Sequence, residues 1–148
     1  ELLKGREFED YVLSLFNLQE DDELILQEWQ GDKSYGKVKA ENNRNPDFVF
    51  RHRQNEFAVE CKWREKLSRD LSKDLFPIKR IENYKHFSEV RHMPVTIILG
   101  VGGEPCNPEL LYKIPLNEIA PIISGNQSIA NYLHPVFSFE VSMFLQQE

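Results

Sequence analysis

The chain has 148 residues, a formal net charge of -6, 41% hydrophobic residues and 28% charged residues. This length fits one domain with a single core, and the composition excludes disordered and fibrous classes. The longest strongly apolar run, Val95 to Val101, is far too short to span a bilayer, so we expect no membrane partner. We also expect no secretory signal, because no basic and apolar leader opens the chain. As an average, the acidic charge argues against a nucleic-acid partner.

The charge is distributed unevenly, which weakens that last exclusion. Residues 33–91 hold 15 of the 18 Lys+Arg and 9 of the 24 Asp+Glu, a balance of +6. The rest of the chain holds 3 basic and 15 acidic residues, a balance of -12. The basic middle is compatible with a phosphate-binding surface, and equally with basic side chains on solvated helix faces.

The two cysteines, Cys61 and Cys106, stand 45 positions apart and form neither a disulfide framework nor a pair with metal-binding spacing. We therefore expect a reducing, cytoplasmic setting. Cys61 is expected to be a small buried apolar group.

The first half of the sequence predicts a helix and three strands. Apolar residues between Phe8 and Phe16 follow the spacing of one buried helical stripe, which predicts a helix over residues 2–16. The further expected elements are a strand over 24–29, a loop over 32–45, and strands over 47–51 and 57–63 that a polar turn joins into a β-hairpin.

The second half predicts a helix and a fully buried strand. Pro77 suits the first turn of a helix that runs to about Val90. The run Val95 to Val101 is typical of a strand buried on both faces. The remaining candidates are a helix or loop over 67–75, a weaker strand over 110–114, short helices over 117–123 and 128–133, and a last strand over 136–145. Because no repeat or linker divides the chain, we expect residues 1–148 to form a single α/β domain.

The hairpin pattern places three ionisable side chains together. A turn centred on Gln54 and Asn55 would pair Asp47 with Lys62, Val49 with Glu60 and Arg51 with Ala58. Side chains alternate along a strand, so Asp47, Glu60 and Lys62 would share one face. The other face would carry six apolar side chains that we expect in the core: Phe48, Phe50, Phe57, Val59, Cys61 and Trp63. A slip of one residue would separate the ionisable groups.

This set of side chains permits metal chemistry. Two carboxylates within reach of each other repel unless a cation lies between them, and oxygen ligands suit Mg²⁺ or Mn²⁺. A lysine beside them could position or deprotonate a metal-activated water, which is the equipment for metal-assisted hydrolysis of a phosphodiester. The alternative is a cross-strand salt bridge between Asp47 and Lys62, worth about 0.2–1 kcal/mol, with Glu60 solvated.

Pro46-Asp47, twelve intervening residues and then Glu60-Cys61-Lys62 resemble the signature of the PD-(D/E)xK nuclease superfamily. This superfamily includes many restriction endonucleases and the archaeal Holliday-junction resolvases. The chain has one Pro-Asp and one Asp/Glu-x-Lys, and both fall on the predicted hairpin. Gly5-Arg-Glu-Phe8-Glu9 is similar to the Gly-x-x-Phe-Glu element on the first helix of the family core.

The resemblance covers about residues 4–115, and the last thirty residues match nothing that we can place. The segment from Tyr84 to Pro108 is similar to the later half of Mrr-like and resolvase-like members. The chain departs from many relatives at Ile81, three residues before Tyr84, where they carry a glutamine.

The resemblance implies a restriction-endonuclease-like core, with a mixed central β-sheet flanked by α-helices. It implies that Asp47 and Glu60 bind the metal, with the Cys61 backbone carbonyl as a third oxygen ligand. Lys62 would orient the attacking water or stabilise charge in the transition state. Glu9 would be a further acidic ligand or a partner of the ligands.

Six basic residues near the hairpin are candidates to contact the phosphates of a nucleic acid: Arg64, Lys66, Arg69, Lys73, Lys79 and Arg80. The alternative is that some of them simply cover helix surfaces.

Two other features are expected to be structural. The glycines of Gly100-Val-Gly102-Gly103 lack the full dinucleotide fingerprint and indicate a turn. The four histidines, His52, His86, His92 and His134, lack a shared metal-binding spacing.

Together these patterns favour an endonuclease that depends on Mg²⁺ or Mn²⁺ and acts on DNA. The alternatives are a non-catalytic module of the same fold that binds nucleic acid or a protein, and a scaffold whose carboxylates are only surface charges. Cutting both strands would make a homodimer reasonable. A domain this acidic should bind DNA weakly and with strong salt sensitivity.

Overall fold

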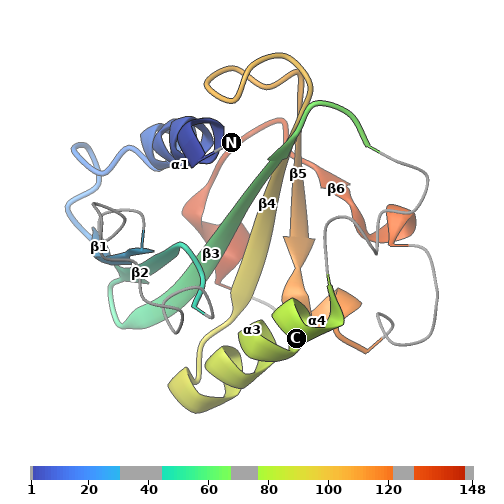
Figure 1. The fold of residues 1–148 in the computed structure, drawn as a ribbon. Helices are drawn as coiled ribbons and strands as arrows, with labels where there is room; N and C mark the ends of the chain where they lie inside the picture. The colour runs from blue at the N-terminus through green and yellow to red at the C-terminus, as the bar shows by residue number, and fades with distance from the viewer. Residues whose placement is uncertain (1, 31–44, 68–76, 122–128, 146–148) are drawn as a thin grey trace.

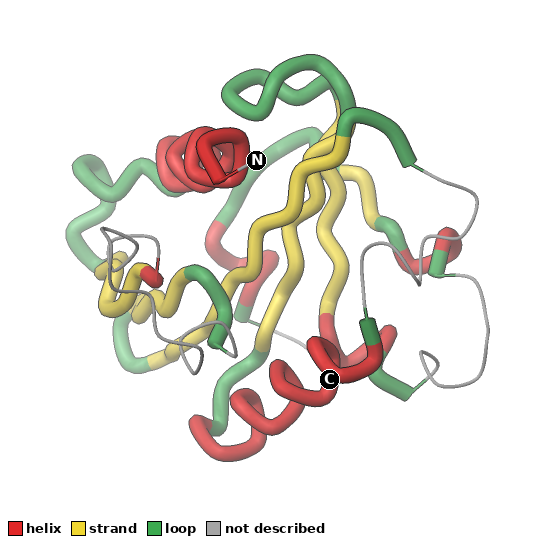
Figure 2. Tube along the Cα trace, in the orientation of Figure 1, coloured by secondary structure: helices red, strands yellow, loops and turns green. Residues whose placement is uncertain are grey.

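The computed structural model describes residues 2–30, 45–67, 77–121 and 129–145. In this part of the chain one mixed sheet of six strands, in the order β1-β2-β3-β4-β5-β6, lies between helical segments (Figure 1, Figure 2). Strands β3 and β4 are parallel, and the other neighbouring pairs are antiparallel. The predicted α/β class, with a mixed central sheet flanked by helices, is confirmed.

The elements agree closely with most of the expected ones. The strands are β1 (Leu24–Trp29), β2 (Phe48–His52), β3 (Asn55–Arg64), β4 (Val95–Val101), β5 (Leu110–Pro115) and β6 (His134–Pro135). The helices are α1 (Leu2–Leu15), α3 (Ile78–Arg91) and α4 (Leu116–Ile119), with 3₁₀ helices η4 (Ala130–Tyr132) and η5 (Val141–Phe144). None of the described helices is long and apolar enough to cross a membrane.

The two faces of the sheet are covered by different helices. On one face, α1 and the residue after it contribute Phe8, Val12 and Phe16 to a cluster. The sheet adds Phe48, Phe50, Phe57, Val59 and Ile98 to this cluster, and η5 adds Phe144. On the other face, α3 packs against a cluster that contains Val49, Ala58, Ile81, Tyr84, Phe87, Ile97 and Leu99. Alternate residues of β2 and β3 therefore enter different clusters, as the two-residue period of a strand requires. Cys61 and Trp63 join the α1 face as partly buried neighbours, so all six predicted apolar residues of the hairpin lie on one side.

The predicted register of the hairpin is wrong by two residues. Val49 pairs with Ala58 and Arg51 with Glu56, because the turn is the two-residue loop Arg53-Gln54. Arg53 adopts a left-handed φ of 58°, and its guanidinium binds the Glu23 carboxylate at 2.8 and 3.2 Å. A shift of two residues preserves the face of every side chain, so the predicted grouping survives although the pairing does not.

Strand β3 is longer than its antiparallel partner, and this difference creates the space used by the site. The pairing with β2 ends at Phe48 and Val59, whereas the pairing with β4 continues to Arg64. Among the described strands, none pairs with residues 60–64 on the β2 side. Asp47 lies just before β2, at the start of this open edge.

The predicted last strand over 136–145 is wrong. The short strand β6 pairs only with Tyr112 and Lys113, and the chain then leaves the sheet edge. The ring of Phe144 packs on the rings of Phe16 and Phe57, with centroids 5.1 and 5.4 Å apart. The apolar residues of this segment thus reach the core by covering the sheet and not by pairing with it.

The other short predictions are partly testable. The helices expected over 117–123 and 128–133 are present as α4 and η4, and residues 122–128 lie outside the described residues. The loop expected over 32–45 and the helix or loop over 67–75 also fall almost entirely outside them.

Gly100 of β4 allows α1 to approach the sheet closely. A Cβ atom at Gly100 would lie 2.5 Å from Cε1 of the Phe8 ring, a distance that real Cβ atoms essentially never show. Phe8 is buried, with 1% of its surface exposed, so the ring has little room to move. The seating of α1, which carries Glu9, therefore depends on a glycine at this position.

We predict that Gly100→Ala lowers the free energy of unfolding by about 1–3 kcal/mol, because it overpacks a filled core. Urea denaturation measures the change. In the double variant Gly100→Ala/Phe8→Leu the loss should be smaller than the sum of the two single losses, because the smaller side chain relieves the clash. Additive losses would contradict the contact.

Candidate functional site

A cavity of about 450 Å³ opens beside the unpaired end of β3. Its walls come from α1, the residue before β2, the end of β3 and the first turn of α3. The lining residues are Lys4, Gly5, Glu9, Asp47, Glu60, Cys61, Lys62, Trp63, Arg64, Glu65 and Arg80. All four residues predicted to act chemically, Glu9, Asp47, Glu60 and Lys62, line this one cavity.

Two hydrogen bonds from backbone N–H groups to the carboxylates hold Asp47 and Glu60 in place. The Cys61 backbone N–H donates to Asp47 Oδ2 at 2.8 Å, and the Asp47 backbone N–H donates to Glu60 Oε1 at 3.2 Å. The Asp47 carboxylate thus occupies the place where β2 would have paired with β3. In a strand, the N–H and C=O of one residue point to the same edge. The Cys61 carbonyl therefore faces the same open edge as Asp47, as the resemblance implied for a third oxygen ligand.

Glu9 reaches the cavity from α1 and is fixed by a tryptophan. The indole Nε1–H of Trp29 donates to Glu9 Oε1 at 3.0 Å. The Arg6 guanidinium lies 5.0 Å from the centroid of the same indole ring, within the range of a cation–π contact. Trp29 at the end of β1 therefore links the acidic residue of α1 to the edge of the sheet.

The pKa values of two of these acids are raised. Burial raises the pKa of Asp47 well above its usual range, and the nearby charges of Glu60 and Glu9 raise it further. Burial also raises the pKa of Glu9, while the Trp29 hydrogen bond opposes the increase. These are the shifts expected of carboxylates that are crowded together away from water, and a bound cation would relieve them.

Lys62 lies beside Glu60 and not opposite Asp47. Its Nζ is 3.8 Å from Glu60 Oε2, and only 10% of its side chain is exposed. Burial lowers the pKa of Lys62, whereas the charge of Glu60 raises it. The alternative of a simple Asp47–Lys62 salt bridge is not found among the ion pairs of the described residues.

Helix α3 supplies two polar groups to the same site. Tyr84 is fully buried, and burial together with the charge of the nearby Glu60 raises the pKa of its hydroxyl. Arg80, one turn earlier, donates from Nη1 to the Tyr84 oxygen at 3.4 Å and lines the cavity. Ile81, where the resemblance led us to note a missing glutamine, is buried in the core.

The predicted phosphate contacts divide into three groups. Arg64 and Arg80 line the cavity. Lys66 and Lys79 are exposed and lie outside its walls. The remaining two, Arg69 and Lys73, lie outside the described residues.

Sequence reasoning did not assign Trp29, Lys4 or Gly5 to the site, although Gly5 belongs to the motif on α1. The spacing of Gly5 and Glu9, one helical turn apart, would have placed Gly5 beside the site. Nothing in the sequence signals the contact of Trp29, because it joins residues twenty positions apart.

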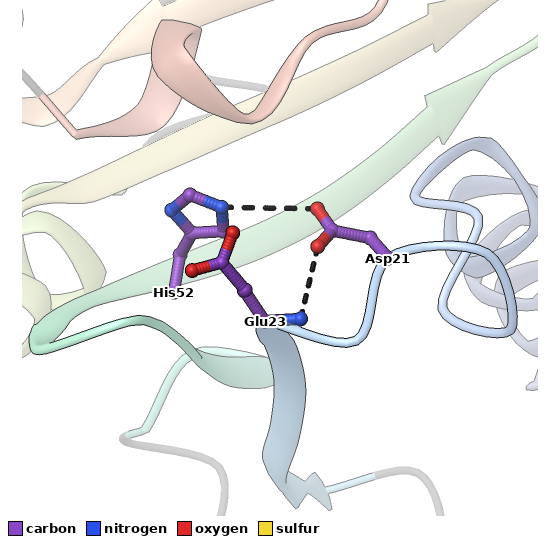
Figure 3. A group of neighbouring side chains, drawn as sticks. All are labelled: Asp21, Glu23 and His52. Atoms are coloured by element: carbon purple, nitrogen blue, oxygen red, sulfur yellow. Dashed lines mark hydrogen bonds and ion pairs between the residues drawn. The ribbon is translucent and has the colours of Figure 1, made fainter.

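A second acidic group lies on the β1–β2 side of the sheet (Figure 3). One atom each from Asp21, Glu23 and His52 lie within 4.8 Å of one another, and the acids of the cavity do not form such a group. Asp21 accepts the Glu23 backbone N–H at 3.0 Å and lies 3.7 Å from His52 Nε2. Since Glu23 also binds Arg53, these contacts are accounted for by the support of the hairpin turn.

A larger cavity of about 800 Å³ lies at the opposite end of β4, between α3 and α4. Its polar residues include Lys85, Glu89 and His92, and none of the predicted site residues lines it. The chemistry is therefore concentrated in the smaller cavity.

The residues of the smaller cavity fit a hard divalent cation. Asp47, Glu60 and the Cys61 carbonyl offer the oxygen ligands that Mg²⁺ and Mn²⁺ prefer, and Glu9 adds a further carboxylate. Each carboxylate has several acceptor positions, so the bonds that hold it in place leave it able to bind a cation.

Comparison with known proteins gives little further guidance. No family model matches the chain, and no curated protein matches it. Among solved structures, the chain is similar to Hjc of Archaeoglobus fulgidus, a Holliday junction resolvase from an archaeal hyperthermophile. The two are 17% identical, the match covers 76% of this chain and 78% of the other, and the TM-score is 0.47.

We predict that Asp47→Asn raises the melting temperature of the metal-free protein at pH 7. A carboxyl whose pKa is raised by folding is ionised more readily in the unfolded chain, so its ionisation costs folding stability above its ordinary pKa. Asparagine removes the charge and can still accept the Cys61 N–H. Each 1 kcal/mol relieved would raise the midpoint by about 2–4 °C.

Glu82→Gln, at an exposed carboxylate of α3, is the matched control and should leave the melting temperature unchanged. Added Mn²⁺ should stabilise the wild type and not Asp47→Asn. A lower melting temperature for Asp47→Asn without metal would show that the charge supports the fold.

Proposed function

We propose that this protein is a nuclease that depends on a divalent metal and hydrolyses phosphodiester bonds of DNA. One observation carries the proposal: Glu9, Asp47, Glu60 and Lys62, from three separate parts of the sequence, line one cavity. The resemblance to PD-(D/E)xK nucleases assigned chemical roles to the same four residues from their order along the chain. Their grouping in space supports those roles independently of the motif.

In this proposal Asp47, Glu60 and the Cys61 carbonyl hold Mg²⁺ or Mn²⁺, with Glu9 as a further ligand or a partner of the ligands. When bound, the cation would supply Lewis-acid stabilisation of the charge that develops on the attacked phosphate. The hydrogen bonds from Cys61 and Trp29 hold Asp47 and Glu9 in place before the substrate binds. Such preorganised ligands avoid reorganisation during the reaction.

Lys62 would act on the attacking water or on the phosphate. Burial lowers its pKa, so the side chain gives up a proton more readily than an exposed lysine does. While protonated, it presents three N–H donors that can orient a water or stabilise negative charge. Arg64 from β3 and Arg80 from α3, which both line the cavity, would contact the phosphates of the bound strand.

We predict that Asp47→Ala and Lys62→Ala each lower Mg²⁺-dependent nicking of plasmid DNA by about 10²-fold or more, because each removes a group that acts on the reacting charge. Cooperative thermal unfolding should be retained in both variants. Lys85→Ala, at an exposed lysine beside the larger cavity, is the control and should keep wild-type activity. Nicking by both variants at the wild-type rate would contradict the site.

Assays on linear, branched and methylated DNA with Mg²⁺ would identify the substrate. Binding of these DNAs by the wild type without cleavage in Mg²⁺ or Mn²⁺ would favour a non-catalytic module of the same fold. Calorimetry with Mn²⁺ separates the two functions further, since the proposed nuclease must bind the metal. The homodimer that cutting both strands would require stays a prediction.

We predict that Tyr84→Phe lowers the rate of cleavage about tenfold, because it removes the hydroxyl that accepts from Arg80 and lies near the Glu60 charge. Tyr84 acts through Glu60, so the variant should need a higher Mn²⁺ concentration for half-maximal activity. A phenylalanine fills the same buried volume, and its effect on stability should be small compared with that on metal dependence. If the Mn²⁺ concentration for half-maximal activity is unchanged, Tyr84 does not position Glu60.

A further inference from the structure

Gly5 of α1 has no role in the fold that explains a glycine. It lies inside the helix, and it is not among the described glycines with a positive φ, which are Gly102 and Gly103. A Cβ atom at Gly5 would meet nothing within 4 Å. Glycine is less favourable than alanine inside a helix, so this position weakens α1 without any gain in packing.

Gly5 is exposed and lines the cavity that holds the proposed metal site. It lies one helical turn before Glu9, and so on the same face of α1. A glycine in the wall of a cavity lets a ligand approach the helix backbone more closely than any other residue would. The space above the Gly5 backbone is open, and it borders the same cavity that Glu9 lines.

Lys4 lies beside this opening. Its Nζ is 5.7 Å from the centroid of the Trp63 ring, a distance that favours a cation–π contact. The ring is itself fixed, because its Nε1–H donates to the Gly102 carbonyl at 3.1 Å. Lys4 is thus an exposed cation held at the rim of the cavity, which Arg64 also lines.

We propose that the nucleic-acid backbone enters the cavity across Gly5, and that Lys4, resting on Trp63, binds a phosphate next to the one that is attacked. The proposal rests on the proposed function and adds the path of the strand. A phosphodiester backbone suits this rim, because its charges meet Lys4 and Arg64 before they reach the carboxylates. An acidic peptide has no phosphate to place at the metal site.

The first test measures how DNA binding by Lys4→Gln depends on salt. Fluorescence anisotropy with Ca²⁺ in place of Mg²⁺ reports binding, and a gel checks that the DNA stays intact. The loss of one phosphate contact should weaken binding equally for all sequences. It should also reduce the slope of log K against log salt by about 0.9 for duplex or about 0.7 for single-stranded DNA. Lys85→Gln, far from the cavity, is the control and should leave the slope unchanged.

The second test uses the size of the residue at position 5. Gly5→Ala should raise the melting temperature by about 2–4 °C, because alanine favours the helix. Gly5→Leu should also keep the fold, yet weaken DNA binding by about tenfold or more by filling the entry path. Ser14→Leu, at an exposed position farther along the same helix, is the matched control and should bind DNA as the wild type does.

The outcomes separate this inference from the function on which it rests. If Gly5→Leu binds DNA as tightly as the wild type, or if the salt slope of Lys4→Gln is unchanged, the proposed entry path is contradicted. Neither result would contradict the proposed nuclease activity. If the wild type binds DNA with the expected salt dependence but does not cut it, the proposed nuclease activity is contradicted and the proposed entry path is retained. A wild type that binds no DNA would overturn both.

Discussion

The hydrogen bond from the Cys61 backbone N–H to the Asp47 carboxylate is the contact on which the site depends. Beyond Val59, β3 has lost its β2 partner, and a backbone N–H there needs another acceptor. Asp47 supplies it at 2.8 Å and is brought to the edge of the sheet by the same bond. The end of strand pairing thus places a carboxylate beside Glu60 and turns the Cys61 carbonyl toward the same edge. A longer β2 would complete the sheet and close the site.

The close grouping of carboxylates at this site lowers the stability of the folded chain. Burial and mutual repulsion raise the pKa values of Asp47 and Glu9, which means that their ionised forms are less favourable in the folded chain than in water. Hydrogen bonds from the Trp29 indole and from the Asp47 backbone N–H hold Glu9 and Glu60 in this arrangement without neutralising them. A folded protein keeps such an arrangement when the residues serve a purpose other than stability. This physical cost favours the metal-binding role that we propose for the cluster over a purely structural one.

Much of this site could be predicted from the sequence, for a reason that is visible in the hairpin. The face of a strand residue depends only on whether its register shifts by an odd or an even number. A turn misplaced by one residue shifts the register by two, and it therefore kept Asp47, Glu60 and Lys62 together. The partner of each residue depends on the register itself, and so the sequence wrongly set Lys62 against Asp47. Local patterns carry no information on Trp29, whose contact with Glu9 exists only after α1 has packed on the sheet. The strand expected over 136–145 failed similarly, because an alternating apolar pattern fits a segment that covers a core as well as a paired strand.

The negative net charge of the whole chain does not predict how strongly this cavity would bind a polyanion. The cavity walls carry four cations, Lys4, Lys62, Arg64 and Arg80, against four carboxylates, Glu9, Asp47, Glu60 and Glu65. The local formal charge is therefore zero while the whole chain carries -6. A bound divalent cation would make the cavity positive, so a phosphate would be attracted more strongly once the metal is present. Arg80 contributes to this balance from α3, where its neighbour Ile81 is turned into the core. Arg80 directly precedes Ile81, the position at which many relatives carry a glutamine. The Arg80 guanidinium adds a positive charge to the site, which the neutral amide of a glutamine would not do. For an acidic protein, metal and phosphate would then bind cooperatively, since each reduces the electrostatic cost of the other.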